Sequence, residues 1–132
     1  MRRVLVVAAV AMAGVFAVAN EARAHARLVA SSPGASAELV ASPPLVELWF
    51  NELLDQGFHE VSVVPAGDAA APARPRSGAA SVDPDDRTHL SAPIERLPEG
   101  VWVVSWRVLS LDGHGARRRF EFRVVGDRGG AR

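Results

Sequence analysis

Apolar side chains that alternate with polar ones constrain this chain more than any other feature of its sequence. Residues 101–110 are the clearest case, because Trp102, Val104, Trp106 and Val108 share one face of an extended strand. We therefore expect both tryptophans in the core. Similar runs cover 45–50, 59–64 and 120–125, with shorter ones at 27–30 and 88–91. No segment beyond residue 24 has a convincing helical period.

Chain-breaking residues separate these runs and indicate turns. Pro and Gly clusters fall at 32–34, 42–44, 98–100 and 112–113. Residues 65–87 are rich in Ala, Pro, Gly, Arg and Asp, and we expect a long surface excursion with an edge strand near 79–82. Short strands with turn signals at intervals over about 100 residues predict an all-β domain. The expected architecture is an immunoglobulin-like β-sandwich or a small Greek-key β-barrel.

Residues 1–24 have the three parts of a secretory signal peptide. Two arginines precede an apolar run over 4–19, and Ala22-Arg23-Ala24 forms a small-residue cleavage site. The run is short for a membrane span, which needs about 20 apolar residues. We expect cleavage after Ala24, which leaves residues 25–132 as a single exported domain that begins at His25. A competing site ends at Ala19, and cleavage there would make Asn20 the first residue.

The composition limits both the partners and the chemistry of the exported chain. Three of the 15 arginines and one of the 15 acidic residues lie in 1–24, so residues 25–132 carry 12 positive and 14 negative charges, a net of −2. This balance argues against nucleic acid or an anionic membrane as partner. We expect the arginine run 117–119 to be a solvated rim beside a turn. The chain has no cysteine, and both methionines lie in 1–24. Any bound metal must therefore have nitrogen and oxygen ligands, and the core alone must stabilise the fold.

Three residues offer a set of nitrogen and oxygen donors for a metal. A free α-amine at His25 can chelate one ion together with its own imidazole, which an internal histidine cannot do. Asp112 and His114 flank a glycine just after the strongest strand. Asp-Gly is also a common hairpin turn, so this tripeptide alone is a weak signal. One amine, two imidazoles and one carboxylate suit Cu(II) in a tetragonal plane. Zinc prefers a tetrahedral arrangement, and non-haem iron remains open on donor type.

Three stretches of this chain resemble the bacterial periplasmic copper-binding protein family CopC. They are the opening at 25–33, the strand and acidic end at 46–52, and the segment 97–114. The string Trp-Arg-Val-x-Ser-x-Asp-Gly-His at 106–114 is the most specific of them. The resemblance covers nearly all of the chain beyond residue 24.

The resemblance implies one Cu(II) ion per chain with a defined set of ligands. In the family these are the N-terminal amine and imidazole and the Asp and His of the closing motif. They fall on His25, Asp112 and His114. Glu52 matches an acidic residue that approaches copper in some members, as a further carboxylate or a supporting group. The methionine-rich Cu(I) site of some members is absent here. Gly115 and Arg118 replace the usual Pro and Gly, which affects the expected loop shape.

The expected function is that of an exported Cu(II)-binding protein, monomeric and not an enzyme. It would capture and hold copper for tolerance, storage or delivery to an inner-membrane copper permease of the CopD type, the partner that the resemblance implies. One alternative is a copper monooxygenase-like enzyme with a histidine brace; another is a metal-free immunoglobulin-like structural domain. We expect His59 and His89 not to bind the metal. Trp49 could shield the site or pack under a loop.

Overall fold

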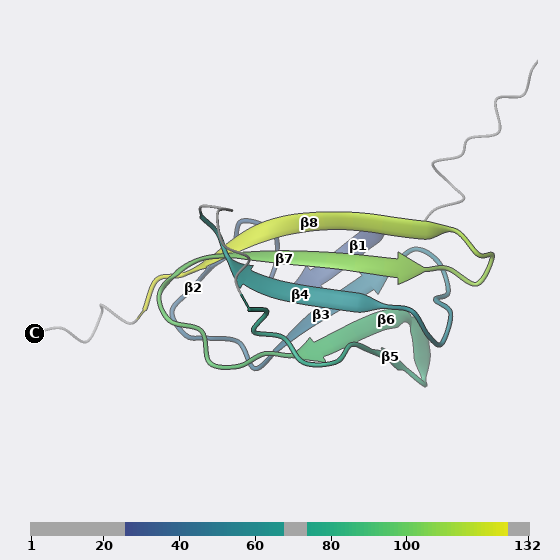
Figure 1. The fold of residues 1–132 in the computed structure, drawn as a ribbon, viewed down its shortest axis with the longest axis horizontal. Coiled ribbons are helices and arrows are strands. Elements are labelled where there is room, and N and C mark those ends of the chain that lie inside the picture. The colour runs from purple at the N-terminus through teal and green to yellow at the C-terminus, as the bar shows by residue number, and fades with distance from the viewer. Residues whose placement is uncertain (1–25, 68–73, 127–132) are drawn as a thin grey trace, which may run out of the picture.

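The computed structural model describes residues 26–67 and 74–126, which form two four-stranded sheets packed face to face (Figure 1). The first sheet has the order β1 (Leu28–Ser32), β3 (Leu45–Phe50), β6 (Asp86–Pro93) and β5 (Ser81–Asp83). The second sheet has the order β2 (Glu38–Leu39), β8 (Gly115–Val124), β7 (Gly100–Leu109) and β4 (Glu60–Pro65). All strand pairs are antiparallel except β2 with β8.

This arrangement confirms the predicted β-sandwich. The two sheets do not join into a closed barrel, because β1 and β5 end one sheet and β2 and β4 end the other. No helix in residues 26–67 or 74–126 is long and apolar enough to cross a membrane.

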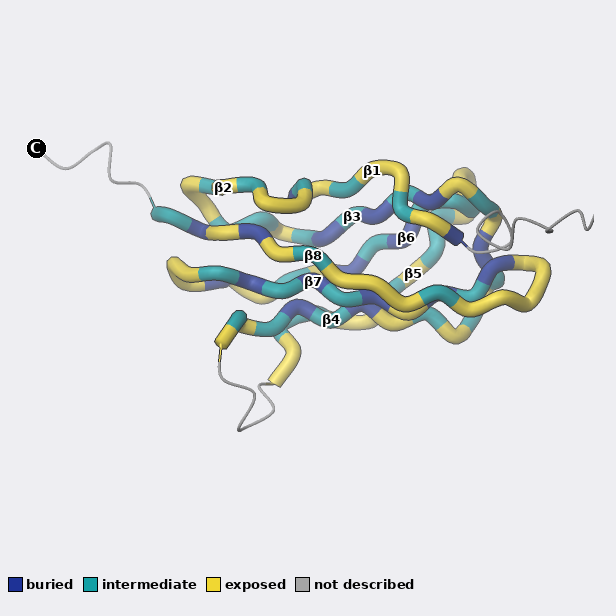
Figure 2. Tube along the Cα trace, turned by 90° about the horizontal axis from the view of Figure 1, so that it is seen from above, coloured by how far each residue is buried: buried dark blue, intermediate teal, exposed yellow. Residues whose placement is uncertain are grey.

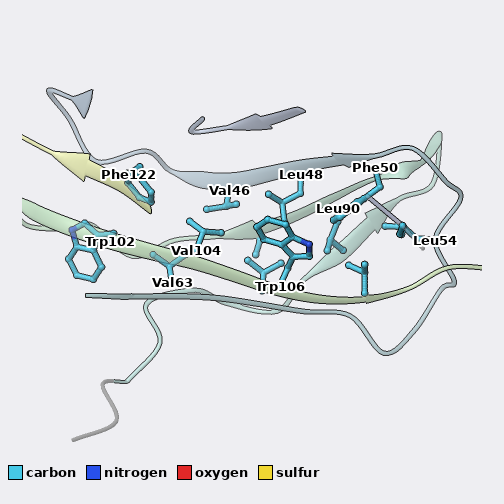
Figure 3. Packing of buried hydrophobic residues seen from close by; sticks show 14 of the residues in the cluster. Val46, Leu48, Phe50, Leu54, Val63, Leu90, Trp102, Val104, Trp106 and Phe122 are labelled. Atoms are coloured by element: carbon cyan, nitrogen blue, oxygen red, sulfur yellow. The ribbon is translucent and has the colours of Figure 1, made fainter. Parts of the chain in front are cut away.

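The core lies between the sheets and follows from the alternation in the sequence (Figure 3). Strand β7 buries the predicted set Trp102, Val104, Trp106 and Val108. The facing sheet contributes Val46, Leu48, Phe50 and Leu90. The Phe50 and Trp106 rings meet edge to face, with centroids 6.3 Å apart and planes at 67°. Apolar burial of this kind is the main stabilising contribution in a domain without disulfides.

The last strand begins earlier than the sequence predicts. Alternation indicated 120–125, whereas β8 starts at Gly115 and pairs with β7 along its whole length. The arginines 117–119 therefore belong to this strand, just beyond the β7–β8 turn, and all three are exposed as expected. Between Gly115 and Arg119 only Ala116 is partly buried, so this half of β8 has no alternation of apolar and polar residues. Its strand conformation comes from pairing with β7, which the local sequence does not indicate.

Two loops at one end of the sandwich lie against each other and position the candidate site. The β3–β4 loop, 51–59, and the β7–β8 turn, 110–114, lie at the same end in Figure 1. The backbone N–H of Leu111 donates to the carbonyl of Leu53 at 3.0 Å, and Leu54 forms a bridge with Ser110. These contacts hold the turn against the loop that follows β3.

Candidate metal centre

The turn that carries Asp112 and His114 is closed by its own backbone. Ser110 N–H donates to the His114 carbonyl, and Gly113 N–H donates to the Ser110 carbonyl, each at 3.0 Å. Gly113 has a φ of 92°, in the left-handed region that glycine adopts without steric cost. The Asp-Gly hairpin signal in the sequence is thus a real turn, and it places Asp112 and His114 together.

The Asp112 carboxylate is the electrostatic centre of this turn. Its Oδ1 accepts a short hydrogen bond from the Ser110 hydroxyl and one from the His114 N–H at 3.1 Å. The His114 Nδ1 also lies 3.1 Å from Oδ1. These bonds, the Ser110 hydroxyl first, lower the pKa of Asp112 from 3.8 to about 2. Asp112 is consequently an anionic oxygen donor throughout the neutral range.

Both side chains are open to solvent and have atoms directed away from this hydrogen-bond cluster. Half of each side chain is exposed, 47% for Asp112 and 51% for His114. The cluster uses Oδ1 of Asp112, and its Oδ2 accepts no hydrogen bond from residues 26–67 or 74–126. The turn can therefore supply one oxygen and one nitrogen to a metal.

The third predicted ligand, His25, lies outside the described residues. The chain that follows it is tied to the same end of the sandwich. Arg27 N–H donates to Asn51 Oδ1 at 2.7 Å, and Asn51 N–H donates back to the Arg27 carbonyl at 3.0 Å. Ala26 is only 5% exposed. Because Asn51 begins the loop that contacts Leu111, Ala26 and Arg27, which we call the N-terminal arm, enter the fold beside the Asp112–His114 turn.

Glu52 lies in the β3–β4 loop next to Asn51 and is half-buried. Across residues 26–67 and 74–126, no three His, Asp or Glu side chains gather closely enough to hold a metal ion. Asp112 and His114 are thus a pair that needs further donors, and Ala26 and Arg27, which follow His25, lie at the same end of the sandwich.

Sequence reasoning missed two residues that hold this end of the molecule together. Ser110, 1% exposed, orients Asp112 through its hydroxyl, and Asn51 ties down the N-terminal arm. Ser110 lies inside the string at 106–114. A serine two residues before an aspartate is common in proteins, so this spacing alone does not indicate that its hydroxyl orients Asp112. Asn51 sits far from Arg27 in sequence, so only the folded chain shows their contact.

His59 and His89 have other partners in the fold. Leu109 N–H donates to His59 Nδ1 at 3.2 Å, and His59 Nε2 lies 2.5 Å from the Asp55 carbonyl. These two contacts require the tautomer protonated at Nε2. The imidazole of His59 therefore continues the β4–β7 ladder beyond Glu60.

His89 is held on the outer face of the first sheet. Its ring stacks on Trp49 with centroids 4.5 Å apart and planes at 5°. Trp49 therefore packs on His89, on the outer face of the first sheet. The His89 Nδ1 lies 3.3 Å from an Asp83 oxygen, and its Nε2 lies 3.3 Å from a Glu47 oxygen. The carboxylates are on opposite sides of the ring, so the three side chains do not converge on one point.

Together, fold and site define a small β-sandwich domain with an Asp–His turn and an N-terminal arm at one end. The CopC domain matches residues 28–125, which is most of the chain, and the protein therefore belongs to the CopC family. No curated protein matches the chain.

Two solved structures show the same similarity. CopC from Methylosinus trichosporium OB3b is 31% identical, with a TM-score of 0.70, and the match covers 79% of this chain and 97% of that one. PcoC from Escherichia coli, described as a methionine-rich copper resistance protein, is 27% identical with a TM-score of 0.65. That match covers 76% of this chain and 98% of PcoC. Residues 25–132 contain no methionine, so this chain lacks the feature for which PcoC is described.

Proposed function

We propose that this protein is an exported Cu(II)-binding protein that captures one copper ion and holds it. The observation that carries the proposal is the ionised Asp112 beside His114, in a turn that lies next to the arm leading from His25. Membership of the CopC family and the similarity to a copper resistance protein support copper as the metal.

The proposed ligands are the amine and imidazole of His25, the Asp112 carboxylate and the His114 imidazole. Two imidazoles, an amine and a carboxylate are the mixed donors that Cu(II) prefers, and Cu(II) also binds most tightly among the divalent first-row metals. Glu52 is a further carboxylate near the arm. Without sulfur beyond residue 24, the site favours Cu(II) over Cu(I).

The amine can act only if the chain begins at His25. We propose that residues 1–24 are a signal peptide cleaved after Ala24, and that residues 25–132 act as a monomer in the periplasm. Copper held there would serve tolerance, storage or delivery to a CopD-type inner-membrane permease. We propose binding and not catalysis, because four donors from the protein leave few open positions for a substrate.

A Cu(II) competition titration on the chain that begins at His25 tests the site. We expect Asp112→Ala and His114→Ala each to weaken binding by at least about tenfold, because each removes a ligand. His89→Ala is the matched control, since it also removes a histidine with a carboxylate neighbour but lies on the outer face of the first sheet. A His114→Ala protein that binds copper as tightly as the unchanged chain would contradict the site.

A further inference from the structure

An open groove of about 650 Å³ runs along one side of the sandwich, between β1 and the first half of β8. Apolar side chains, Leu28, Trp106 and Phe120, form its floor, and Arg27 and the arginines 117–119 line its rim. Figure 2 shows this half of β8 largely exposed, in yellow. The groove therefore joins an apolar surface to a concentration of positive charge.

The backbone of β8 is open along this groove. Strand β2 covers only the far end of β8, where it pairs with Arg123 and Val124, and Ser36 N–H donates to the Glu121 carbonyl at 2.7 Å. Alternate residues of a strand direct their N–H and C=O groups to the same edge. Arg117 and Arg119 therefore direct these groups to the same edge as Glu121, and there they have no backbone partner among the described residues.

The arginine side chains lie on both sides of this open edge. Arg117 and Arg119 alternate onto the outer face of the second sheet, opposite Arg107 and Ser105. Arg118 has the alternation of the core-facing residues and is paired with Trp106, yet it is exposed and lies over the groove. None of the side chains of arginines 117–119 forms a hydrogen bond or ion pair with a residue of 26–67 or 74–126.

We propose that the β8 edge binds an extended acidic segment of a partner protein. Such a segment would add as a strand beside Arg117 and Arg119, as in β-augmentation. Its acidic side chains would meet Arg117 and Arg119 on the outer face, and its apolar side chains would cover Leu28 and Phe120 on the other face. The unpaired backbone supplies affinity, and the charge selects an acidic sequence.

The same charge argues against a second copy of this chain as the occupant. Two β8 edges placed side by side would bring the arginine runs together, and like charges directly opposite are destabilising. An inward-directed charge such as Arg118 is also a known device against edge-to-edge self-association. An acidic segment turns this repulsion into attraction.

The groove lies beside the proposed copper site but does not depend on it. Gly115, at one end of the groove, follows His114 directly, and Ala26, which also lines it, follows His25. A segment bound here would lie next to the metal ligands. Peptide binding is expected from the copper-free chain, so failure of either proposal leaves the other testable.

The test is fluorescence anisotropy with a labelled eight-residue peptide of alternating Glu and Val, titrated with the copper-free protein. We expect saturable binding that weakens as salt is added, and no binding of the matching Lys–Val peptide. Arg117→Glu and Arg119→Glu should each weaken binding by about tenfold. Arg96→Glu, the same charge change at an exposed arginine outside this groove, should leave it unchanged.

Two further measurements need no change to the protein. Amide exchange at Arg117 and Arg119 should slow when the peptide binds, and a peptide N-methylated at alternate residues should lose its affinity. Failure of the Glu–Val peptide to bind, or binding without slower exchange at these two amides, would overturn the proposal. Binding of inorganic polyphosphate or anionic lipid vesicles with equal sensitivity to Arg119→Glu would also overturn it, in favour of a general anion site.

Discussion

At the scale of single residues, Asn51 controls how the N-terminal arm meets the fold. Its side-chain oxygen accepts the Arg27 N–H at 2.7 Å, and its own N–H donates to the Arg27 carbonyl. These two bonds fix the backbone two residues after His25. Asn51 is therefore a positioning residue for the proposed copper site, since it touches the arm and not the metal.

We expect Asn51→Ala to weaken Cu(II) binding several-fold while the protein stays folded. Loss of the hydrogen bond costs about 1 kcal/mol, and the loosened arm would lose more conformational entropy when it binds the metal. Competition titration measures the affinity, and faster amide exchange at Arg27 reports the loosened arm. Asn51→Asp keeps an oxygen acceptor and should restore most of the affinity. Full affinity in Asn51→Ala, despite faster exchange at Arg27, would contradict this role.

At the scale of the elements, acid should weaken the turn between β5 and β6. The Thr88 hydroxyl, followed by the Thr88 N–H, lowers the pKa of Asp86, and the Asp85 N–H, followed by His89, lowers that of Asp83. A lowered pKa stabilises the folded state above the ordinary value of 3.8, and this contribution is lost as the pH falls below it.

Asp86→Asn keeps the shape of the side chain but removes its titration. The difference in unfolding midpoint between about pH 6 and about pH 3 should be smaller for this variant than for the unchanged chain. Asp85→Asn is the control, because the Asp85 carboxylate accepts no hydrogen bond from the described residues. An equal acid dependence in Asp86→Asn and the unchanged chain would show that this carboxylate does not stabilise the turn.

The strands that sequence predicts well are those whose alternation is apolar on one face. Leu45–Phe50 and the core face of β7 follow directly, because one face is buried and the other is not. Strand β2 has two residues and is defined only by its parallel pairing with β8. Asp112 and His114 could be found because they lie close together in sequence. The contact between Asn51 and Arg27 depends on the pairing of distant segments, which no local pattern records.

At the scale of the whole molecule, stability depends on one core between two sheets. The chain has no cysteine, so no disulfide limits the unfolded state. Leu48 is fully buried in the centre of that core. We expect Leu48→Ala to lower the free energy of unfolding by about 3 kcal/mol, measured by denaturant titration.

Val40 supplies the control for that substitution, since it is 66% exposed. Val40→Ala should change the free energy of unfolding by less than about 0.5 kcal/mol. A Leu48→Ala protein as stable as Val40→Ala would mean that the core repacks around the lost side chain.

The proposed copper site requires His25 to be the first residue of the chain. The most direct measurement compares the Cu(II) affinity of the chain that begins at His25 with that of the same chain extended by one alanine. The extension leaves every side chain in place but converts the chelating amine into an amide. We predict a loss of at least about tenfold in affinity, because the amine and imidazole no longer close on one ion. Equal affinity for the two chains would contradict a site built on the N-terminal histidine.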